Sequence, residues 1–212
     1  MKITITDLFE IPSAIIYNPD IYSNTNKVVI NSNLAKKNSI FFAIIGEKHD
    51  GHNFIDDAIK NGAKTIVINK EYYKKIKNDN ITIVSVDNTA VAFGDLARIY
   101  RKKLNGAVIG ITGSNGKTTT KEFLATILSE QYNVVKTEAN NNNHIGVPLT
   151  VFNAKADTEI LILEEGTNHF GEIEYIASIS LPDFALITNI GDSHLEFLKN
   201  REGVYKEKSA LF

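Results

Sequence analysis

Strand-like and helix-like patterns alternate along the second half of the chain, and this alternation constrains the fold more than any other feature. Apolar runs at 107–112, 159–164 and 184–190 are each followed by a segment with helical spacing of its apolar residues. Strands that are apolar throughout and alternate with helices are typical of a parallel sheet covered on both faces. We therefore expect an α/β fold with a parallel-sheet domain here. Its helices are expected up to Ile127, after Gly171 and from about Arg201 to the last residues.

The first part of the chain predicts a smaller α/β domain. A helical pattern ends at the pair Asn61-Gly62, a common helix stop, and lies between strand patterns. The expected elements are strands at 39–45, 64–68 and 81–86, a helix at 53–62, a charged connector at 69–80 and a second helix at about 88–104. We place the domain boundary before this second helix, which gives a domain over 1–86, and a second domain over 87–212 that the helix connects to it.

Composition excludes several classes of function. The 212 residues are 43% hydrophobic, carry a formal net charge of −2 and include no cysteine. Such a chain can bury a core, but it has no basic patch for nucleic acid, and no disulfide or thiolate site. The N-terminus lacks the apolar stretch of a signal peptide, and no apolar run reaches the roughly 18 residues of a membrane span. We expect a cytoplasmic protein with no nucleic-acid partner and no membrane insertion.

A glycine-rich segment, GSNGKTT, lies between the strand at 107–112 and the next helix. It misses the strict phosphate-loop pattern by one position, because Ile111 stands where the first glycine is required. Its glycines can still turn backbone N–H groups toward one point, while the helix N-terminus and Lys117 add positive charge. The Thr118 hydroxyl could reach a phosphate-bound Mg²⁺. We expect a phosphate site, and the alternative is a plain glycine turn with a solvated lysine.

Acids and histidines follow the later strands, at the edge where ligands gather in open α/β sheets. Glu164 and Glu165 end the strand at 159–164, and one of the two is expected to point into the crevice as an oxygen ligand for Mg²⁺. His194 follows the strand at 184–190. The plainer alternatives are a solvated strand-end acid and a surface histidine.

Two further loops are rich in polar side chains. The run NNNNHIGVPLT (140–150) places amides before an apolar segment with a proline, which we interpret as a turn. The run EEGTNHFGEI adds Asn168 and His169 just after the acidic pair. Amides of this kind could hold a polar substrate, although a simple asparagine turn is an equal alternative.

Taken together, these segments resemble the Mur ligase family of cell-wall synthesis. The resemblance rests on ITGSNGKTTTKE, NNNNHIGVPLT, LEEGTNHFGEI and ITNIGDSHLEFLKNREGVYKEKSALF, in this order, and IFFAIIGEKHDGHNFIDDAIKNGAKTIVI resembles the UDP-sugar-binding domain of the same family. It implies ATP-dependent formation of an amide bond through an acyl phosphate. GTNHFGEI resembles the branch that adds D-alanyl-D-alanine to UDP-N-acetylmuramoyl-tripeptide.

The resemblance also implies roles for individual residues. The ATP phosphates would be held by Gly113, Ser114, Asn115, Gly116, Lys117, Thr118 and Thr119, with Asn189 nearby. One Mg²⁺ would be bound by Thr118 and Glu164, and a second by His194, with Lys208 as a ligand after carboxylation by CO₂. Lys117, His194 and Lys208 would be catalytic, and Ser32, Asn142 and Asn143 would contact the substrate.

The sequence also departs from the family pattern. Asn31-Ser32-Asn33 replaces an Asp-Ser-Arg or Asp-Thr-Arg motif, Glu165 replaces an apolar residue, and Glu207 and Ala210 replace a small residue and an acid beside Lys208. Complete ligases are longer, so we expect a monomeric fragment with an incomplete central domain, no C-terminal domain and weak or no turnover. The alternatives are a non-catalytic relative that binds a nucleotide or UDP-sugar, and another ATP-dependent amide ligase, such as one of the folylpolyglutamate synthase type.

Overall fold

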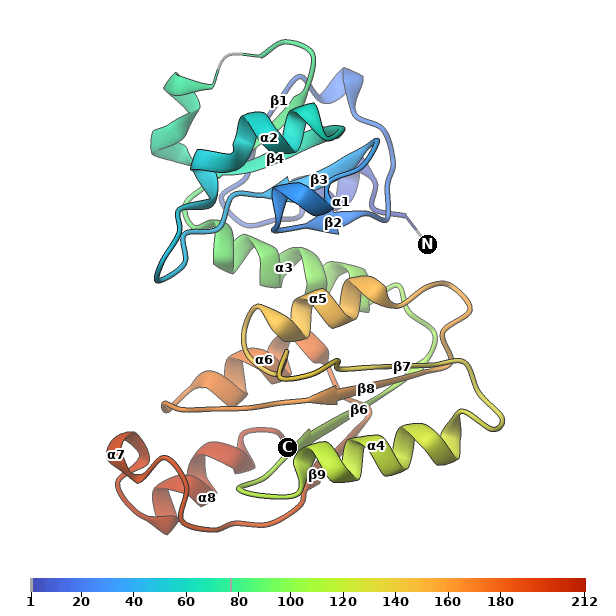
Figure 1. Cartoon of the computed structure of the whole chain (residues 1–212), viewed down its shortest axis with the longest axis vertical. Coiled ribbons are helices and arrows are strands. Elements are labelled where there is room, and N and C mark those ends of the chain that lie inside the picture. Colours follow the sequence, from blue (N-terminus) through green and yellow to red (C-terminus); the bar gives the residue numbers. More distant parts are fainter. Residues whose placement is uncertain (1, 77) are drawn as a thin grey trace. The chain divides into compact units, whose positions relative to one another are not determined.

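The computed structural model describes residues 2–76 and 78–212, and it divides into two compact α/β units, Met1–Tyr100 and Arg101–Phe212 (Figure 1). Each unit has its own sheet, so each is described by itself. Within the described residues, no helix is long and apolar enough to span a bilayer.

The first unit contains a five-stranded sheet in the order β1-β5-β4-β3-β2. The strands are β1 (Ile15–Tyr17), β2 (Val28–Val29), β3 (Ser39–Phe42), β4 (Ala63–Asn69) and β5 (Thr82–Val86). Strand β1 is antiparallel to β5, and the other pairs are parallel. The three strands expected in this part are therefore present, although β3 ends three residues earlier than its apolar pattern, and the short β1 and β2 were not predicted.

Helices and 3-10 turns surround this sheet. They are α1 (Ile5–Phe9), η1 (Pro19–Ile21), η2 (Ser32–Leu34), η3 (Gly51–Phe54), α2 (Ile55–Lys60), η4 (Lys70–Lys75) and α3 (Thr89–Arg101). The helix expected at 53–62 is thus a 3-10 turn followed by a shorter α2, which stops before Gly62 because this glycine takes φ +109°. The helix expected at 88–104 is α3, and its buried Phe93 packs edge-on against Phe42, with ring centroids 5.0 Å apart.

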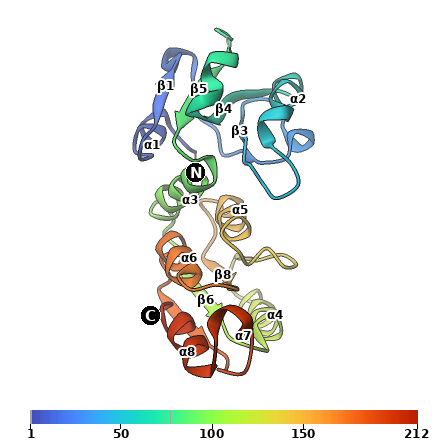
Figure 2. The same cartoon turned by 90° about the vertical axis from the view of Figure 1, so that its left-hand side faces the viewer.

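The second unit has a fully parallel sheet, as the alternating pattern predicted, and its strand order is β7-β8-β6-β9, in which the short β7 was not expected. Its strands are β6 (Ala107–Thr112), β7 (Val134–Lys136), β8 (Ile160–Glu164) and β9 (Phe184–Ile187). Helix α4 (Lys117–Leu128) packs on one face through Ala125, which joins Ile111 and Ile162 in a buried cluster. Helices α5 (Gly146–Asn153) and α6 (Glu172–Ser180) lie on the opposite face (Figures 1 and 2). Helices α7 (Leu195–Leu198) and α8 (Arg201–Ser209) follow β9.

Three expectations for this unit were wrong. The apolar segment with a proline is helix α5, and Pro148 is tolerated because it is the third helical residue, where a backbone N–H has no partner within the helix. Strand β9 ends at Ile187 and not at 190, and the Thr188 N–H makes the next hydrogen bond, to the Thr112 carbonyl oxygen at 2.9 Å. Helix α8 ends at Ser209 rather than running to the last residues.

The parallel arrangement positions the candidate site. Strands β6, β8 and β9 point the same way, so their carboxyl ends meet at one edge of the sheet. That edge carries the glycine-rich loop after β6, Glu164 at the end of β8 and Asn189 just beyond β9.

Candidate functional site

The glycine-rich loop between β6 and α4 depends on two glycines with positive φ. Gly113 has φ +152° and Gly116 has φ +78°. A Cβ atom on Gly113 would collide with the Thr188 hydroxyl, so the loop needs glycine there. Gly116 is the N-cap residue of α4 and makes no side-chain cap hydrogen bond, which leaves the first N–H groups of the helix for an anion. The Lys117 ammonium donates to the Gly113 carbonyl oxygen at 2.7 Å, so this lysine lies over the loop.

The segment after β9 fixes the shape of this loop. Asn189 accepts from two loop N–H groups: its carbonyl oxygen from Ser114 at 3.1 Å and its side-chain Oδ1 from Asn115 at 2.9 Å. The Ser114 hydroxyl accepts from the Gly191 N–H at 2.9 Å and lies 3.0 Å from the Ser193 hydroxyl. Asn189 and Ser114 were both expected at the nucleotide. In the structure, their hydrogen bonds connect the glycine-rich loop to the segment after β9.

Glu164 lies beside the first turn of α4 and is 3% exposed. Its Oε2 accepts from the Thr118 hydroxyl at 2.9 Å, and its Oε1 accepts from the Asn142 side-chain amide at 3.0 Å. Glu164 is therefore the member of the acidic pair that lies at the glycine-rich loop.

Glu165 points to the opposite face of the sheet, because successive strand side chains alternate. The Ser180 hydroxyl donates to its Oε1 at 2.8 Å, and its Oε2 is buried without a hydrogen-bond partner. Burial raises the pKa of Glu165 to about 7, against the opposing effect of the Ser180 hydrogen bond. Glu165 is a buried structural acid and lies away from the loop.

Lys121 is a site residue that the sequence analysis missed. It is 1% exposed, and its ammonium lies 3.5 Å from Oε2 of Glu164. The sequence held a signal for it, because Lys121 stands four residues before the buried Ala125 and so on the sheet-facing side of α4. A lysine on the apolar face of a helix requires a buried counter-charge, and Glu164 is that charge.

Three basic side chains from different elements lie close enough to influence one another electrostatically: Lys117 on α4, His194 at the N-cap of α7 and Lys208 on α8. Burial, followed by the charges of Lys208 and Lys117, lowers the pKa of His194. Burial, followed by the charge of Lys117, lowers the pKa of Lys208 to about 8. The closeness of these three groups thus favours the neutral forms of His194 and Lys208, and leaves Lys117 as the positive charge at the loop.

Glu207 fixes α8, and with it Lys208, against α6. It is 3% exposed and accepts three hydrogen bonds, from the N–H groups of Gly171 at 2.7 Å and Ile173 at 2.8 Å and from the Thr167 hydroxyl at 3.0 Å. The carboxylate therefore caps the N-terminus of α6 from another helix. This residue departs from the family pattern, and the structure gives it a definite role.

The remaining candidate residues of the second unit either make contacts with residues nearby in the sequence or are exposed. Asn143 caps α5, because its Oδ1 accepts from the N–H groups of Ile145 at 3.1 Å and Gly146 at 2.8 Å. His169 lies 3.1 Å from Glu172 and packs against Phe197. Thr119 and Asn168 are exposed.

Ser32 belongs to the first unit, where it is buried at the start of η2. Its carbonyl oxygen accepts from the Asn61 side chain at 3.0 Å. The adjacent Asn31 accepts from the Asn33 N–H at 2.9 Å, so the unusual asparagines form a local turn.

Two stretches of the chain match known sequence families. Residues 24–101 match the family described as Mur ligase family, catalytic domain, and residues 111–212 match the Mur ligase middle domain. The chain belongs to the Mur ligase family.

Individual members of the family agree with this. UDP-N-acetylmuramoyl-tripeptide--D-alanyl-D-alanine ligase of Bacillus subtilis is 38% identical over 98% of this chain and 45% of its own length. The Escherichia coli enzyme of the same name is 32% identical over 100% of this chain and 45% of its own length. The chain therefore spans less than half the length of these Mur ligases.

Solved Mur ligase structures share the fold. MurF from Acinetobacter baumannii has a TM-score of 0.88 and 32% identity over 100% of this chain and 46% of that chain. MurF ligase from Thermotoga maritima in complex with ADP has a TM-score of 0.79 and 37% identity over 87% of this chain and 42% of that chain.

The pKa of Lys208 makes the stability of this Mur ligase chain depend on pH. Folding lowers this pKa from the ordinary 10.5 to about 8, so between these values the unfolded chain holds a proton that the folded chain has lost. Stability is therefore expected to rise with pH across this window. Urea unfolding of wild type and Lys208→Met at pH 7.5 to 10.5 would measure it, and the variant should lack this part of the slope. Equal slopes in the two proteins would contradict the lowered pKa.

Proposed function

We propose that the second unit binds the triphosphate of ATP at the glycine-rich loop. The observation that carries this proposal is the position of the Lys117 ammonium over a glycine-rich loop that ends at an uncapped helix N-terminus. Backbone N–H groups, the helix dipole and the Lys117 ammonium would together offset the phosphate charge. The ADP complex of the Thermotoga maritima relative supports the same ligand.

The side chains beside the loop fit Mg²⁺ in their chemistry. Glu164 and Thr118 offer a carboxylate and a hydroxyl, which are oxygen ligands of the kind that Mg²⁺ prefers, and they lie 2.9 Å apart. In the part of the chain that the structure describes, no three His, Cys, Asp or Glu side chains form a metal site by themselves, so the phosphates would complete the coordination. We assign one Mg²⁺ to Thr118 and Glu164, and a second to His194 and a carboxylated Lys208. When bound, Mg²⁺ would neutralise charge on the transferring phosphoryl group.

The reaction that we propose for the whole enzyme is the addition of D-alanyl-D-alanine to UDP-N-acetylmuramoyl-tripeptide. The terminal carboxylate of the tripeptide attacks the γ-phosphorus of ATP and releases ADP, and the dipeptide amine then displaces phosphate from the acyl phosphate. Lys117 would follow the γ-phosphoryl group and offset its charge. Lys208, with its lowered pKa, would supply the neutral amine that reacts with CO₂. Formation of the carbamate releases a proton, and it gives Lys208 an anionic group whose oxygens can bind a metal ion.

We assign the substrates to the two units as follows. The first unit would bind the UDP-sugar, with Ser32 in the contacting loop, and Asn142 and Asn143 would face the substrate from the second unit. The domain limits that go with this proposal are 1–86 and 87–212. We propose that the protein acts as a monomer in the cytoplasm, where ATP and the nucleotide-linked precursor are available.

The ATP site can be tested on the 212-residue chain by calorimetric titration with a non-hydrolysable ATP analogue and Mg²⁺. We expect one nucleotide per chain, and competition by ADP. If circular dichroism shows that the chain is folded and the titration shows no binding of the analogue, the proposal is wrong for this chain.

A second titration, with UDP-N-acetylmuramoyl-tripeptide, separates this function from the folylpolyglutamate synthase type of ligase. Asn31 and Asn33 form a local turn at positions where the family pattern has charged residues, so affinity for the UDP-sugar has to be measured directly. Affinity for the UDP-sugar supports the cell-wall ligase. Binding of ATP without any affinity for the UDP-sugar would favour the folate-type enzyme.

A further inference from the structure

Lys121 and Glu164 form a buried ion pair beside the glycine-rich loop. Their side chains are 1% and 4% exposed, and the ammonium lies 3.5 Å from Oε2 of Glu164. Taking either charge out of water is costly unless the other charge is present. In the absence of a ligand, each of the two therefore compensates the other.

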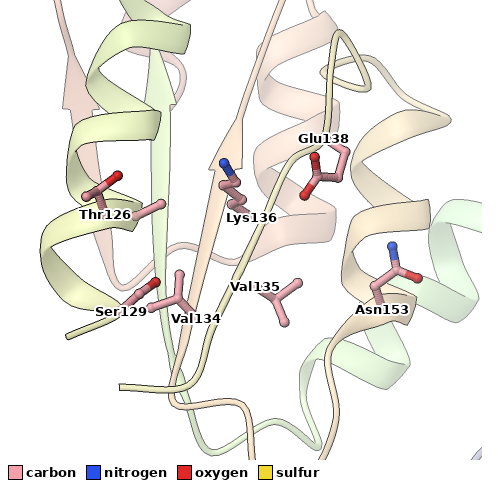
Figure 3. A pocket seen from close by; sticks show the side chains of 8 residues that line it. Thr126, Ser129, Val134, Val135, Lys136, Glu138 and Asn153 are labelled. Atoms are coloured by element: carbon pink, nitrogen blue, oxygen red, sulfur yellow. The ribbon is translucent and has the colours of Figure 1, made fainter. Parts of the chain in front are cut away.

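The pair is the inner end of a row of four charged side chains. Lys121 also lies 3.3 Å from Oε1 of Glu122, and Glu122 pairs in turn with Lys136 of β7. Lys136 is 29% exposed and lines a surface pocket of about 350 Å³ with Thr126 of α4 (Figure 3). Two cations and two carboxylates alternate in the row, so it is neutral as it stands.

This neutrality has a consequence for a metal ion at Glu164. A free Mg²⁺ meets a carboxylate that Lys121 already balances, and the ammonium repels the ion at close range. Within the described residues, no group of three metal-ligating acids or histidines could compensate for this repulsion. A nucleotide changes the balance, because its phosphates bring several negative charges with the metal.

We propose that Lys121 makes the binding of Mg²⁺ at Glu164 dependent on the nucleotide. The lysine holds the carboxylate in place beside Thr118 and excludes free Mg²⁺, whereas Mg²⁺ that arrives with the phosphates is accepted. Lys121 is thus a positioning residue that acts through Glu164. The inference rests on the proposed MgATP site.

The test is Lys121→Met, which keeps an unbranched side chain of similar size and removes its charge. Binding of Mg²⁺ alone is measured by calorimetry and by the shift of the thermal unfolding midpoint with Mg²⁺ concentration. We expect the dissociation constant for free Mg²⁺ to fall by about tenfold or more relative to wild type. Lys136→Met is the matched control, because it removes the same charge from the exposed end of the row, and it should respond to Mg²⁺ as wild type does.

Two results would overturn the proposal: equal affinity for free Mg²⁺ in wild type and Lys121→Met, or an equal gain in Lys136→Met. If Lys121→Met unfolds without metal, refolding on addition of Mg²⁺ is the expected result. Failure to refold would contradict the proposal if the neutral double variant Lys121→Met/Glu164→Gln folds. That double variant should also lose the response to Mg²⁺. These measurements use Mg²⁺ without a nucleotide. Their outcome can therefore be distinguished from a failure of the proposed ATP site, which the ATP titration tests.

Discussion

Lys117→Ala is expected to weaken binding of the ATP analogue by roughly 10- to 100-fold. The Lys117 ammonium lies over the loop at 2.7 Å from the Gly113 carbonyl oxygen, and it is the only full positive charge within the segment 113–119. A hydrogen bond to a charged group contributes about 1.5–3 kcal/mol, which corresponds to this range of affinities. Calorimetric titration of the variant beside wild type, at one salt concentration, measures the loss.

The control for this variant is Lys102→Ala, which removes the same charge from an exposed position outside the loop. It should leave the affinity unchanged within about twofold, because exposed charges are screened by salt. If Lys117→Ala binds the analogue as wild type does, the loop does not hold the phosphates. If both variants lose affinity equally, the effect is one of net charge and not of the loop.

Glu207→Ala is expected to lower the free energy of unfolding of the second unit by about 2–4 kcal/mol. Its buried carboxylate accepts three hydrogen bonds, and two of these satisfy N–H groups at the start of α6. Removal leaves these donors buried or poorly solvated, at a cost of about 1–3 kcal/mol each, partly recovered by water. Urea unfolding followed by circular dichroism measures the change.

Two variants on the same helix make this prediction specific. Glu207→Gln keeps one acceptor oxygen but presents an amide N–H to a backbone donor. Its free energy of unfolding should therefore lie between those of wild type and Glu207→Ala. Glu202→Ala, at an exposed position in the first turn of α8, should cost less than about 1 kcal/mol. A Glu207→Ala protein as stable as Glu202→Ala would show that the contact between α8 and α6 contributes little.

The parallel sheet and the glycine-rich loop followed from local patterns. Strand β6 was predicted at its observed bounds, and the strands that end in Glu164 and Ile187 were found within three residues. Periodicity records which side chains are buried, and a parallel sheet brings its carboxyl ends to one edge, so the neighbourhood of the loop could be predicted. Helix α5 was missed because Pro148 and the preceding asparagines read as a turn.

The sequence by itself determined the alternation of β6, β8 and β9 with helices, the loop at their shared edge and the family. The strand pattern could not choose between Glu164 and Glu165, because alternation places the two on opposite faces without saying which face holds α4; only the resemblance to the family indicated Glu164. Nor could the sequence show that Lys121 pairs with Glu164, 43 positions later, or that Glu207 caps α6. Only the tertiary structure decided these contacts, because a buried charge is stable only beside a partner, and packing between distant elements determines which partner is within reach.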